Sequence, residues 1–134
     1  MTTNLEADDA LVDRFLNLEI PNGDFTHEMH VAVGWALLRR MPYVEALAAC
    51  AATIKAMAAR AGAPHKFNTT ITAAYLALID CHLREMPDET WRAFIAAHPM
   101  LLDKRLLARW YPPGALQAQA ARETFVMPPP ALTA

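Results

Sequence analysis

The chain has 134 residues, of which 54% are hydrophobic and 19% charged, and its net charge at neutral pH is -2. This composition excludes a disordered protein, and the length suits one domain with a sizeable core. No basic stripe is present for a nucleic acid to bind, and no apolar run approaches the ~18 residues of a membrane span. The N-terminus is polar and acidic, unlike a secretory signal, so we expect a cytoplasmic protein with no nucleic-acid or membrane partner.

Helix-forming residues dominate the chain, and glycine occurs only four times. Alternating runs of β-branched residues, which would predict strands, are missing. We therefore predict an all-α fold, a single-domain compact bundle of about five to seven helices. The helical domain covers residues 1–126, and an extended proline-rich C-terminal tail covers residues 127–134, because consecutive prolines cannot continue a helix.

Apolar residues at helical spacing, together with capping residues, define the individual helices. Asp24 or Thr26 suits the start of the second helix, Gly62 suits the end of the third, and Gly34 lets another helix approach closely. Asn68, Thr69 or Thr70 then caps the fourth helix. In chain order, the predicted helices cover about residues 5–18, 27–41, 43–61, 69–84, 87–98, 101–110 and 115–122.

The segment Thr26-His27-Glu28-Met29-His30 opens the second predicted helix. Side chains at i and i+3 are neighbours on a helix, so His27 and His30 face the same way, toward the core. Burial and the positive end of the helix both disfavour imidazolium, so we expect both rings to be neutral near pH 7. Neutral imidazoles suit a general base or a metal ligand, although each ring can also simply fill space in the core.

A metal site is the weaker interpretation of this pair. His27 and His30 supply two ligands, whereas a catalytic zinc usually has three protein ligands and an open position. Glu28 projects from another face of the helix, so the loop residue His65 is the third ligand to consider. We predict no cofactor, and keep a divalent metal held by His27, His30 and His65 as an alternative.

A second group of polar residues surrounds the start of the fourth predicted helix, where Lys66 precedes Asn68 and Thr69. Capping explains one or two of these side chains. Thr72 and Tyr75 continue the polar stripe along the face of Asn68, which predicts a lined cavity that accepts an anionic or carbonyl-bearing ligand. The predicted substrate-binding residues are Lys66, Asn68, Thr69, Thr72, Tyr75 and, as part of a lid, Tyr111.

Several well-known motifs are missing from the sequence. It contains no phosphate-binding loop, no dinucleotide-binding glycine pattern, no Cys-x-x-Cys pair and no Gly-x-Ser-x-Gly turn, so a nucleotide-dependent enzyme or a serine hydrolase is not supported. The two cysteines, Cys50 and Cys81, fall within predicted helices. We expect buried, reduced thiols, as is usual in the cytosol.

Three segments together resemble a group of small helical bacterial proteins without a secure activity. They are Thr26-His27-x-x-His30 with its following apolar run, Lys66-Phe67-Asn68-Thr69-Thr70-Ile71-Thr72, and Leu101-Leu102-Asp103-Lys104 with Trp110-Tyr111, Ala121-Arg122 and Phe125-Val126-x-Pro128. The resemblance covers about residues 25–128 and implies a helical fold with these segments around the site. In that group a histidine and a glutamate replace Asn68 and Thr69, and would complete a metal site with the two histidines. Their replacement here weakens the metal interpretation.

These observations favour a small-molecule enzyme of the lyase, isomerase or cyclase type. His27 and His30 would be the catalytic acid and base in a pocket between the second and fourth helices. The alternatives are a non-catalytic module that binds a small molecule or another protein, and a metal-dependent enzyme with a histidine-based site. The expected partner is a small-molecule substrate, and a homodimer is left open.

Overall fold

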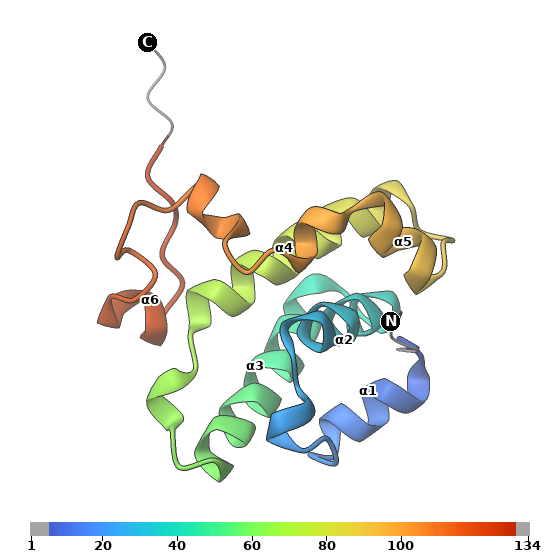
Figure 1. The fold of residues 1–134 in the computed structure, drawn as a ribbon, viewed down its shortest axis with the longest axis horizontal. Coiled ribbons are helices and arrows are strands. Elements are labelled where there is room, and N and C mark those ends of the chain that lie inside the picture. Colours follow the sequence, from blue (N-terminus) through green and yellow to red (C-terminus); the bar gives the residue numbers. More distant parts are fainter. Residues whose placement is uncertain (1–5, 131–134) are drawn as a thin grey trace.

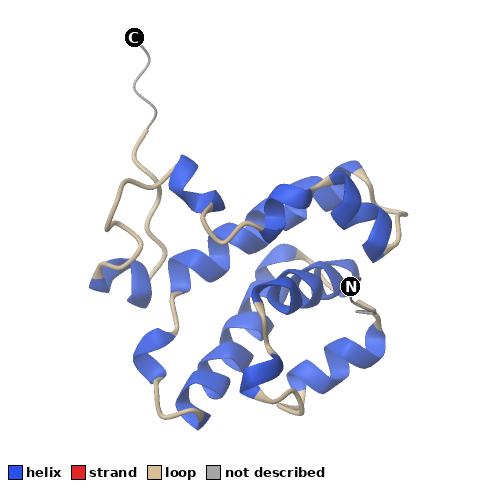
Figure 2. Cartoon of the chain, in the orientation of Figure 1, coloured by secondary structure: helices blue, strands red, loops and turns tan. Residues whose placement is uncertain are grey.

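The computed structural model describes residues 6–130, which form an all-helical bundle without a strand in that range (Figures 1 and 2). This confirms the predicted fold class. The α-helices are α1 (Asp9–Leu16), α2 (His27–Arg40), α3 (Tyr43–Arg60), α4 (Thr69–Glu85), α5 (Trp91–Ala97) and α6 (Gln119–Glu123). Short 3-10 helices lie between them, namely η1 (Asn22–Asp24), η2 (Pro64–Lys66), η3 (Pro99–Leu102) and η4 (Leu106–Arg109).

Helix α2 lies at the centre of the bundle and packs against α1, α3 and α4. Its eight residues from Val31 to Leu38 are all buried, as expected of a helix that is surrounded by others. A Cβ added to Gly34 would lie 3.1 Å from Leu76 Cδ1 and 3.2 Å from Ile79 Cδ1. The close approach predicted at this glycine is therefore confirmed, and α4 is the helix that approaches.

Local capping fixes where the central helices begin and end. The Thr26 hydroxyl accepts a hydrogen bond from the Met29 N–H at 3.2 Å, and Asn68 Oδ1 accepts one from the Ile71 N–H at 2.9 Å. Gly62, just past α3, has a φ of +72°, a conformation that favours glycine. The sequence offered alternatives for the first two caps, and the structure selects Thr26 and Asn68.

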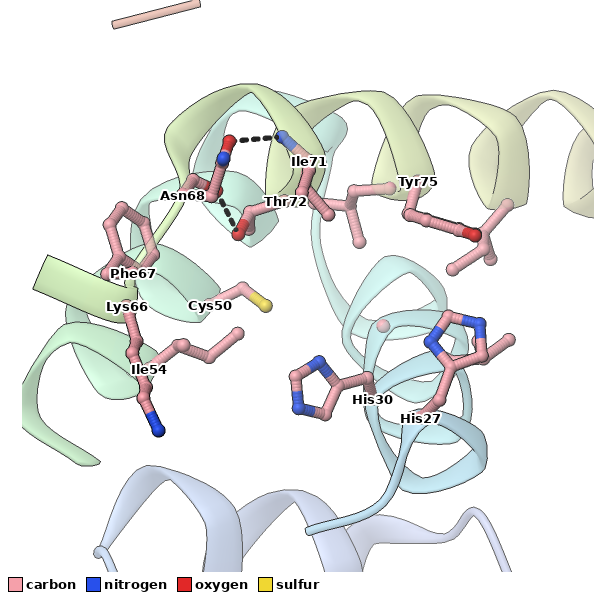
Figure 3. Close-up of a pocket in the computed structure, with 14 residues that line it drawn as sticks. His27, His30, Cys50, Ile54, Lys66, Phe67, Asn68, Ile71, Thr72 and Tyr75 are labelled. Carbon is pink, nitrogen blue, oxygen red and sulfur yellow. Dashed lines mark hydrogen bonds between the residues drawn. The ribbon is translucent and has the colours of Figure 1, made fainter. Parts of the chain in front are cut away.

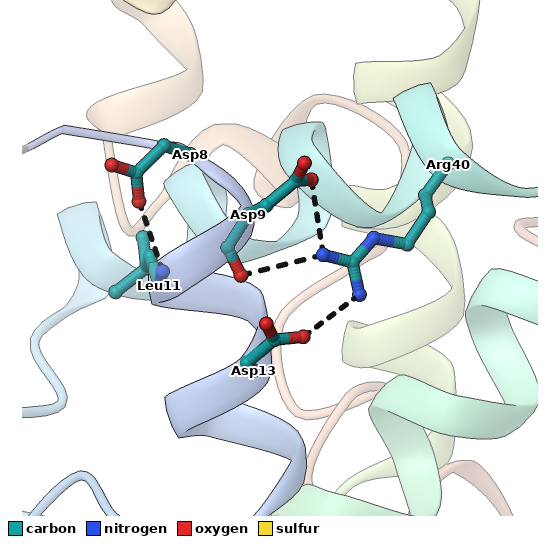
Figure 4. A network of polar contacts seen from close by, with 5 residues as sticks. All are labelled: Asp8, Asp9, Leu11, Asp13 and Arg40. Atoms are coloured by element: carbon teal, nitrogen blue, oxygen red, sulfur yellow. Dashed lines mark hydrogen bonds and ion pairs between the residues drawn. The ribbon is translucent and has the colours of Figure 1, made fainter.

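Helix α1 is anchored to the far end of α2 by a surface network (Figure 4). The Arg40 guanidinium lies 3.0 Å from Asp9 Oδ1 and 3.2 Å from Asp13 Oδ1. Asp8 caps α1 by accepting a hydrogen bond from the Leu11 N–H at 2.9 Å. The predicted first helix began at Leu5, which lies outside the described residues; the observed helix runs from Asp9 to Leu16.

The predicted helices of the C-terminal third are partly wrong. The expected helix over residues 101–110 is instead η3 and η4, separated by a turn in which Asp103 Oδ1 accepts a hydrogen bond from the Arg105 N–H at 2.8 Å. Such local bonds compete with helical ones. The helices expected over 87–98 and 115–122 begin later, at Trp91 and Gln119. Gly114, with a φ of +82°, belongs to the turns that precede α6.

The segment after α6 is attached to α4. The buried Thr70 hydroxyl donates a hydrogen bond to the Thr124 carbonyl at 2.8 Å and accepts one from the Val126 N–H at 3.0 Å. The Tyr111 hydroxyl donates to the Val126 carbonyl at 2.7 Å. Residues 127–130 are not helical, and the rest of the predicted tail lies outside the described residues. Within residues 6–130, every helix is too short or too polar to cross a membrane.

Candidate functional site

A cavity of about 170 Å³ lies between α2, α3, η2 and α4 (Figure 3). It brings together the first turns of α2 and α4, which are the two segments that the sequence singled out. Its walls are mostly apolar, with a few polar groups. The lining residues are His27, His30, Val31, Gly34, Cys50, Ile54, Lys66, Phe67, Asn68, Ile71, Thr72, Tyr75, Leu76 and Ile79.

The His27 ring is held in one orientation by two contacts. Its Nε2 lies 3.0 Å from the carbonyl oxygen of Leu101, and its edge packs against the Tyr75 ring with 5.0 Å between centroids. A carbonyl only accepts, so in the neutral ring Nε2 carries the proton and Nδ1 has a free lone pair. That second ring nitrogen turns toward the cavity in Figure 3. Burial lowers the pKa of His27, although the Leu101 carbonyl opposes this effect.

The His30 ring stacks on Phe25, with 4.0 Å between centroids. The residue is exposed to solvent, and in Figure 3 its ring faces the hollow. Desolvation is the main cause that lowers the pKa of His30 to about 4, and charge repulsion from the neighbouring His27 and Lys104 contributes to the same shift. Among residues 6–130 the structure gives the His30 ring nitrogens no hydrogen-bond partner, so both are available to a ligand.

Asn68, which caps α4, and two polar residues of α4 in the cavity wall already make hydrogen bonds to the backbone. Asn68 Nδ2 donates to the Leu116 carbonyl at 2.7 Å, in addition to the cap formed by its Oδ1. The Thr72 hydroxyl donates to the Asn68 carbonyl at 2.9 Å, and the Tyr75 hydroxyl donates to the Asp103 carbonyl at 2.6 Å. The two hydroxyl oxygens can still accept a hydrogen bond from a ligand.

Three of the residues predicted for the site lie elsewhere. His65 and Thr69 line a separate surface groove with Lys55 and Arg122. Tyr111 is buried against the C-terminal segment and lines a third groove. The loop conformation of η2 turns His65 outward, so it does not join His27 and His30. Within residues 6–130, no group of three or more His, Cys, Asp or Glu residues is arranged to hold a metal ion.

Several lining residues were not predicted. Cys50 and Ile54 come from α3, and Phe67 and Ile71 come from the segments around the start of α4. Burial raises the pKa of Cys50 to about 12, so its thiol remains protonated and unreactive. Cys81 is exposed rather than buried, contrary to the prediction, and both cysteines are free. The Leu101 carbonyl that orients His27 had no signal in the sequence, since any residue supplies a carbonyl.

The cavity thus presents a neutral imidazole with a free basic nitrogen and a second neutral imidazole whose nitrogens are both unoccupied. In an apolar hollow such groups can move a proton and hydrogen-bond an oxygen of the same small molecule. Comparisons of the chain with known protein families, characterised proteins and solved structures found no significant match.

Proposed function

We propose that this protein is a small-molecule enzyme of the lyase or isomerase type, which transfers a proton at a carbon next to a carbonyl group. The proposal is carried by one observation: His27 and His30 face the same cavity and differ in how they are held. The hydrogen bond to Leu101 fixes the His27 ring and leaves its basic nitrogen, Nδ1, free. Neither ring nitrogen of His30 has a hydrogen-bond partner among residues 6–130. Such a difference in environment suits two groups with separate roles.

In this mechanism His27 is the base. The lone pair of Nδ1 takes a proton from the carbon next to the carbonyl, and the electrons of the broken C–H bond form the carbon–carbon double bond of an enolate. The negative charge then lies on the carbonyl oxygen. If the ketone carries a β,γ double bond, the enolate is a dienolate, and return of the proton from His27 to its γ-carbon completes an isomerisation. If the β-carbon carries a leaving group, the enolate electrons re-form the carbonyl and make the α,β double bond, the bond to the leaving group breaks with its electrons, and His27 gives the proton to that group, which completes an elimination.

His30 stabilises the enolate by donating a hydrogen bond from its neutral N–H. A histidine with a pKa of about 4 is a poor base near pH 7 but remains an uncharged donor throughout the reaction. The apolar side chains of Val31, Ile54 and Ile71 in the wall strengthen this hydrogen bond by lowering the polarity around it. A hydrogen-bond donor placed where charge develops is worth about 10²-fold or more in rate.

The cavity volume limits the size of the substrate. At about 170 Å³ it is close to the ~150 Å³ cavity that holds a benzene molecule in another protein. A small ketone or ketoacid therefore fits within the cavity.

A non-catalytic binding protein is the second candidate. It is favoured by the hydrogen bonds that Asn68, Thr72 and Tyr75 donate to the backbone, because these side chains are already engaged in holding the fold. His30 and Lys66 then supply free donors to a ligand, and Nδ1 of His27 supplies a free acceptor. In that case the imidazoles would hold a ligand without changing it.

Hydrogen exchange of small ketones in D2O separates the two candidates, because it detects proton abstraction before any later step. We expect the protein to speed the loss of the protons next to the carbonyl, as followed by NMR. His27→Gln retains a donor for Leu101 but has no base, so the rate should fall by about 10²-fold or more. His30→Gln should also slow exchange, and His65→Gln, outside the cavity, should match the wild type.

Binding without any exchange would overturn the enzyme proposal in favour of the binding module. Equal exchange by His27→Gln and the wild type would exclude His27 as the base. Circular dichroism and urea unfolding of each variant ensure that lost activity does not reflect lost structure.

A further inference from the structure

We propose that the cavity selects substrates that carry one negative charge, and that Lys66 binds this anionic group, typically a carboxylate. This inference rests on the proposed function, since it identifies the substrate class of the same cavity. The preferred substrate is then a small ketone carboxylate rather than a neutral ketone.

The charge of the cavity wall is the first argument. Lys66 is the one formally charged residue that lines the cavity, and no Asp or Glu accompanies it. Its side chain is exposed, and in Figure 3 it lies beside Ile54 at the left edge of the hollow, across from His30. Among residues 6–130 the structure gives Lys66 no ion pair. An unpaired ammonium at the edge of an apolar cavity favours an anionic ligand.

A second cation acts on the same cavity from another direction. Lys104 is close enough to His27 and His30 that its charge lowers the pKa of both. It lines a neighbouring groove that shares Ile71 and Tyr75 with the cavity as common walls. Two cations therefore raise the electrostatic potential where the substrate would bind.

A carboxylate that acts on His27 lies outside the cavity wall. Asp103 acts on His27 but does not line the cavity, and its Oδ1 accepts a hydrogen bond from the Arg105 N–H at 2.8 Å. The formal charge of the cavity lining, which comes from Lys66, thus differs in sign from the net charge of the whole chain, which is -2. A positive cavity also suits the reaction, because Lys66 and Lys104 would stabilise the negative charge that develops on the enolate oxygen.

A matched pair of ketones provides the test. Levulinate and 2,5-hexanedione have the same number of non-hydrogen atoms and share a methyl ketone, but one ends in a carboxylate and the other in a second neutral ketone. We expect the wild type to bind levulinate about tenfold more tightly, as measured by NMR titration of the backbone amides around His30 and Ile71. Added salt should weaken levulinate binding and leave hexanedione binding unchanged.

Variants assign the effect to Lys66. Lys66→Gln should remove the preference for levulinate, and Lys66→Arg should retain most of it. Arg92→Gln is the matched control, because it removes one positive charge from an exposed position of α5 outside the cavity.

The possible results separate the two proposals. Equal binding of the two ketones, or tighter binding of hexanedione, would overturn selection for an anion while leaving the proposed function intact. If neither ketone shifts the resonances of the cavity residues, the proposed function itself is wrong. A levulinate preference that survives in Lys66→Gln would overturn the role given to Lys66.

Discussion

The His27 imidazole donates a hydrogen bond from Nε2 to the carbonyl oxygen of Leu101 at 3.0 Å, across 74 positions of sequence. This bond joins the first turn of α2 to η3 and determines which ring nitrogen faces the cavity. Because Leu101 is fully buried, the acceptor is held in place by the core rather than by a mobile side chain. The protein thus fixes the tautomer of His27 through its backbone, as a supporting hydrogen bond does in many histidine sites.

The tautomer of His27 can be measured directly by NMR. We expect the neutral ring at pH 7 to have a protonated Nε2 and an unprotonated Nδ1. Only this tautomer places an N–H against the Leu101 carbonyl, which can accept a hydrogen bond but cannot donate one. Long-range proton–nitrogen correlation spectra distinguish the two nitrogen types by their chemical shifts. A spectrum with a protonated Nδ1 would contradict the role of His27 as a base at that atom.

Because the pKa of His30 is lowered in the folded protein, we expect the free energy of unfolding to decrease at acidic pH. Burial disfavours imidazolium, so below the ordinary histidine pKa of 6.5 the unfolded chain binds more protons at this position than the folded one. Stability from His30 is therefore complete above pH 6.5 and is lost as the pH falls toward about 4. His27 and His98, whose pKa values are also lowered by burial, act in the same direction.

Replacing His30 tests this dependence. His30→Phe retains a ring over Phe25 and cannot be protonated, so its free energy of unfolding should fall less steeply with acidification than that of the wild type. Urea unfolding at several pH values between about 7.5 and 4.5 gives the two slopes. Parallel slopes would mean that His30 titrates alike in the folded and unfolded protein.

Replacing Gly34 with alanine should weaken ligand binding while changing the free energy of unfolding only slightly. Alanine gains about 1 kcal/mol over glycine within a helix, but its Cβ would press on the Leu76 and Ile79 methyl groups at 3.1 and 3.2 Å. Both side chains line the cavity and can turn into the hollow. We therefore expect the free energy of unfolding of Gly34→Ala to lie within about 1 kcal/mol of that of the wild type. Its smaller cavity should bind small ketones more weakly.

Gly23→Ala is the comparison for this variant, since nothing lies within 4 Å of the added methyl group. Denaturation and ketone titration of both variants give the result. A loss of several kcal/mol in Gly34→Ala would show that the helices cannot relax. Unchanged ketone affinity would show that ligands do not enter this cavity.

The parts of the site that sequence reasoning located are those determined by local pattern. Thr26 caps α2, His27 and His30 follow at helical spacing, and Gly34 marks the approach of α4. Each of these features depends on residues within a few turns. The same reasoning placed Asn68 and Tyr75 in one wall, because Tyr75 lies two turns along α4 on the side of its N-cap residue Asn68.

The parts that sequence reasoning missed depend on contacts distant in sequence or on backbone conformation. The Leu101 carbonyl has no side-chain signature, and its position follows from how η3 packs on α2 and α4. Residues 101–110 have the composition of a helix, but the turn at Asp103 divides them into two shorter elements. His65 is next to Lys66 in sequence, yet the turn of η2 sends the two side chains to different grooves.

The Thr70 hydroxyl is expected to hold the C-terminal segment against α4 through its two hydrogen bonds to the backbone. Thr70→Val retains the shape of the side chain but leaves the Thr124 carbonyl and the Val126 N–H without this partner. Leaving such groups unpaired in a buried position costs about 1–3 kcal/mol each, so we expect a loss of about 2 kcal/mol or more in the free energy of unfolding. The Tyr111 hydroxyl still donates to the Val126 carbonyl at 2.7 Å, so the segment should loosen rather than detach completely.

Thr70→Ser provides the control, because it retains the hydroxyl and loses one methyl group, which costs only about 1 kcal/mol. Urea unfolding compares the overall stabilities of the two variants. Chymotrypsin cleavage at Phe125, which is 44% exposed and lies between the two bonded backbone groups, reports on the segment itself. Faster cleavage in Thr70→Val than in Thr70→Ser would show that the hydroxyl holds the segment. Equal cleavage and equal stability would show that packing of α6 against α4 holds it instead.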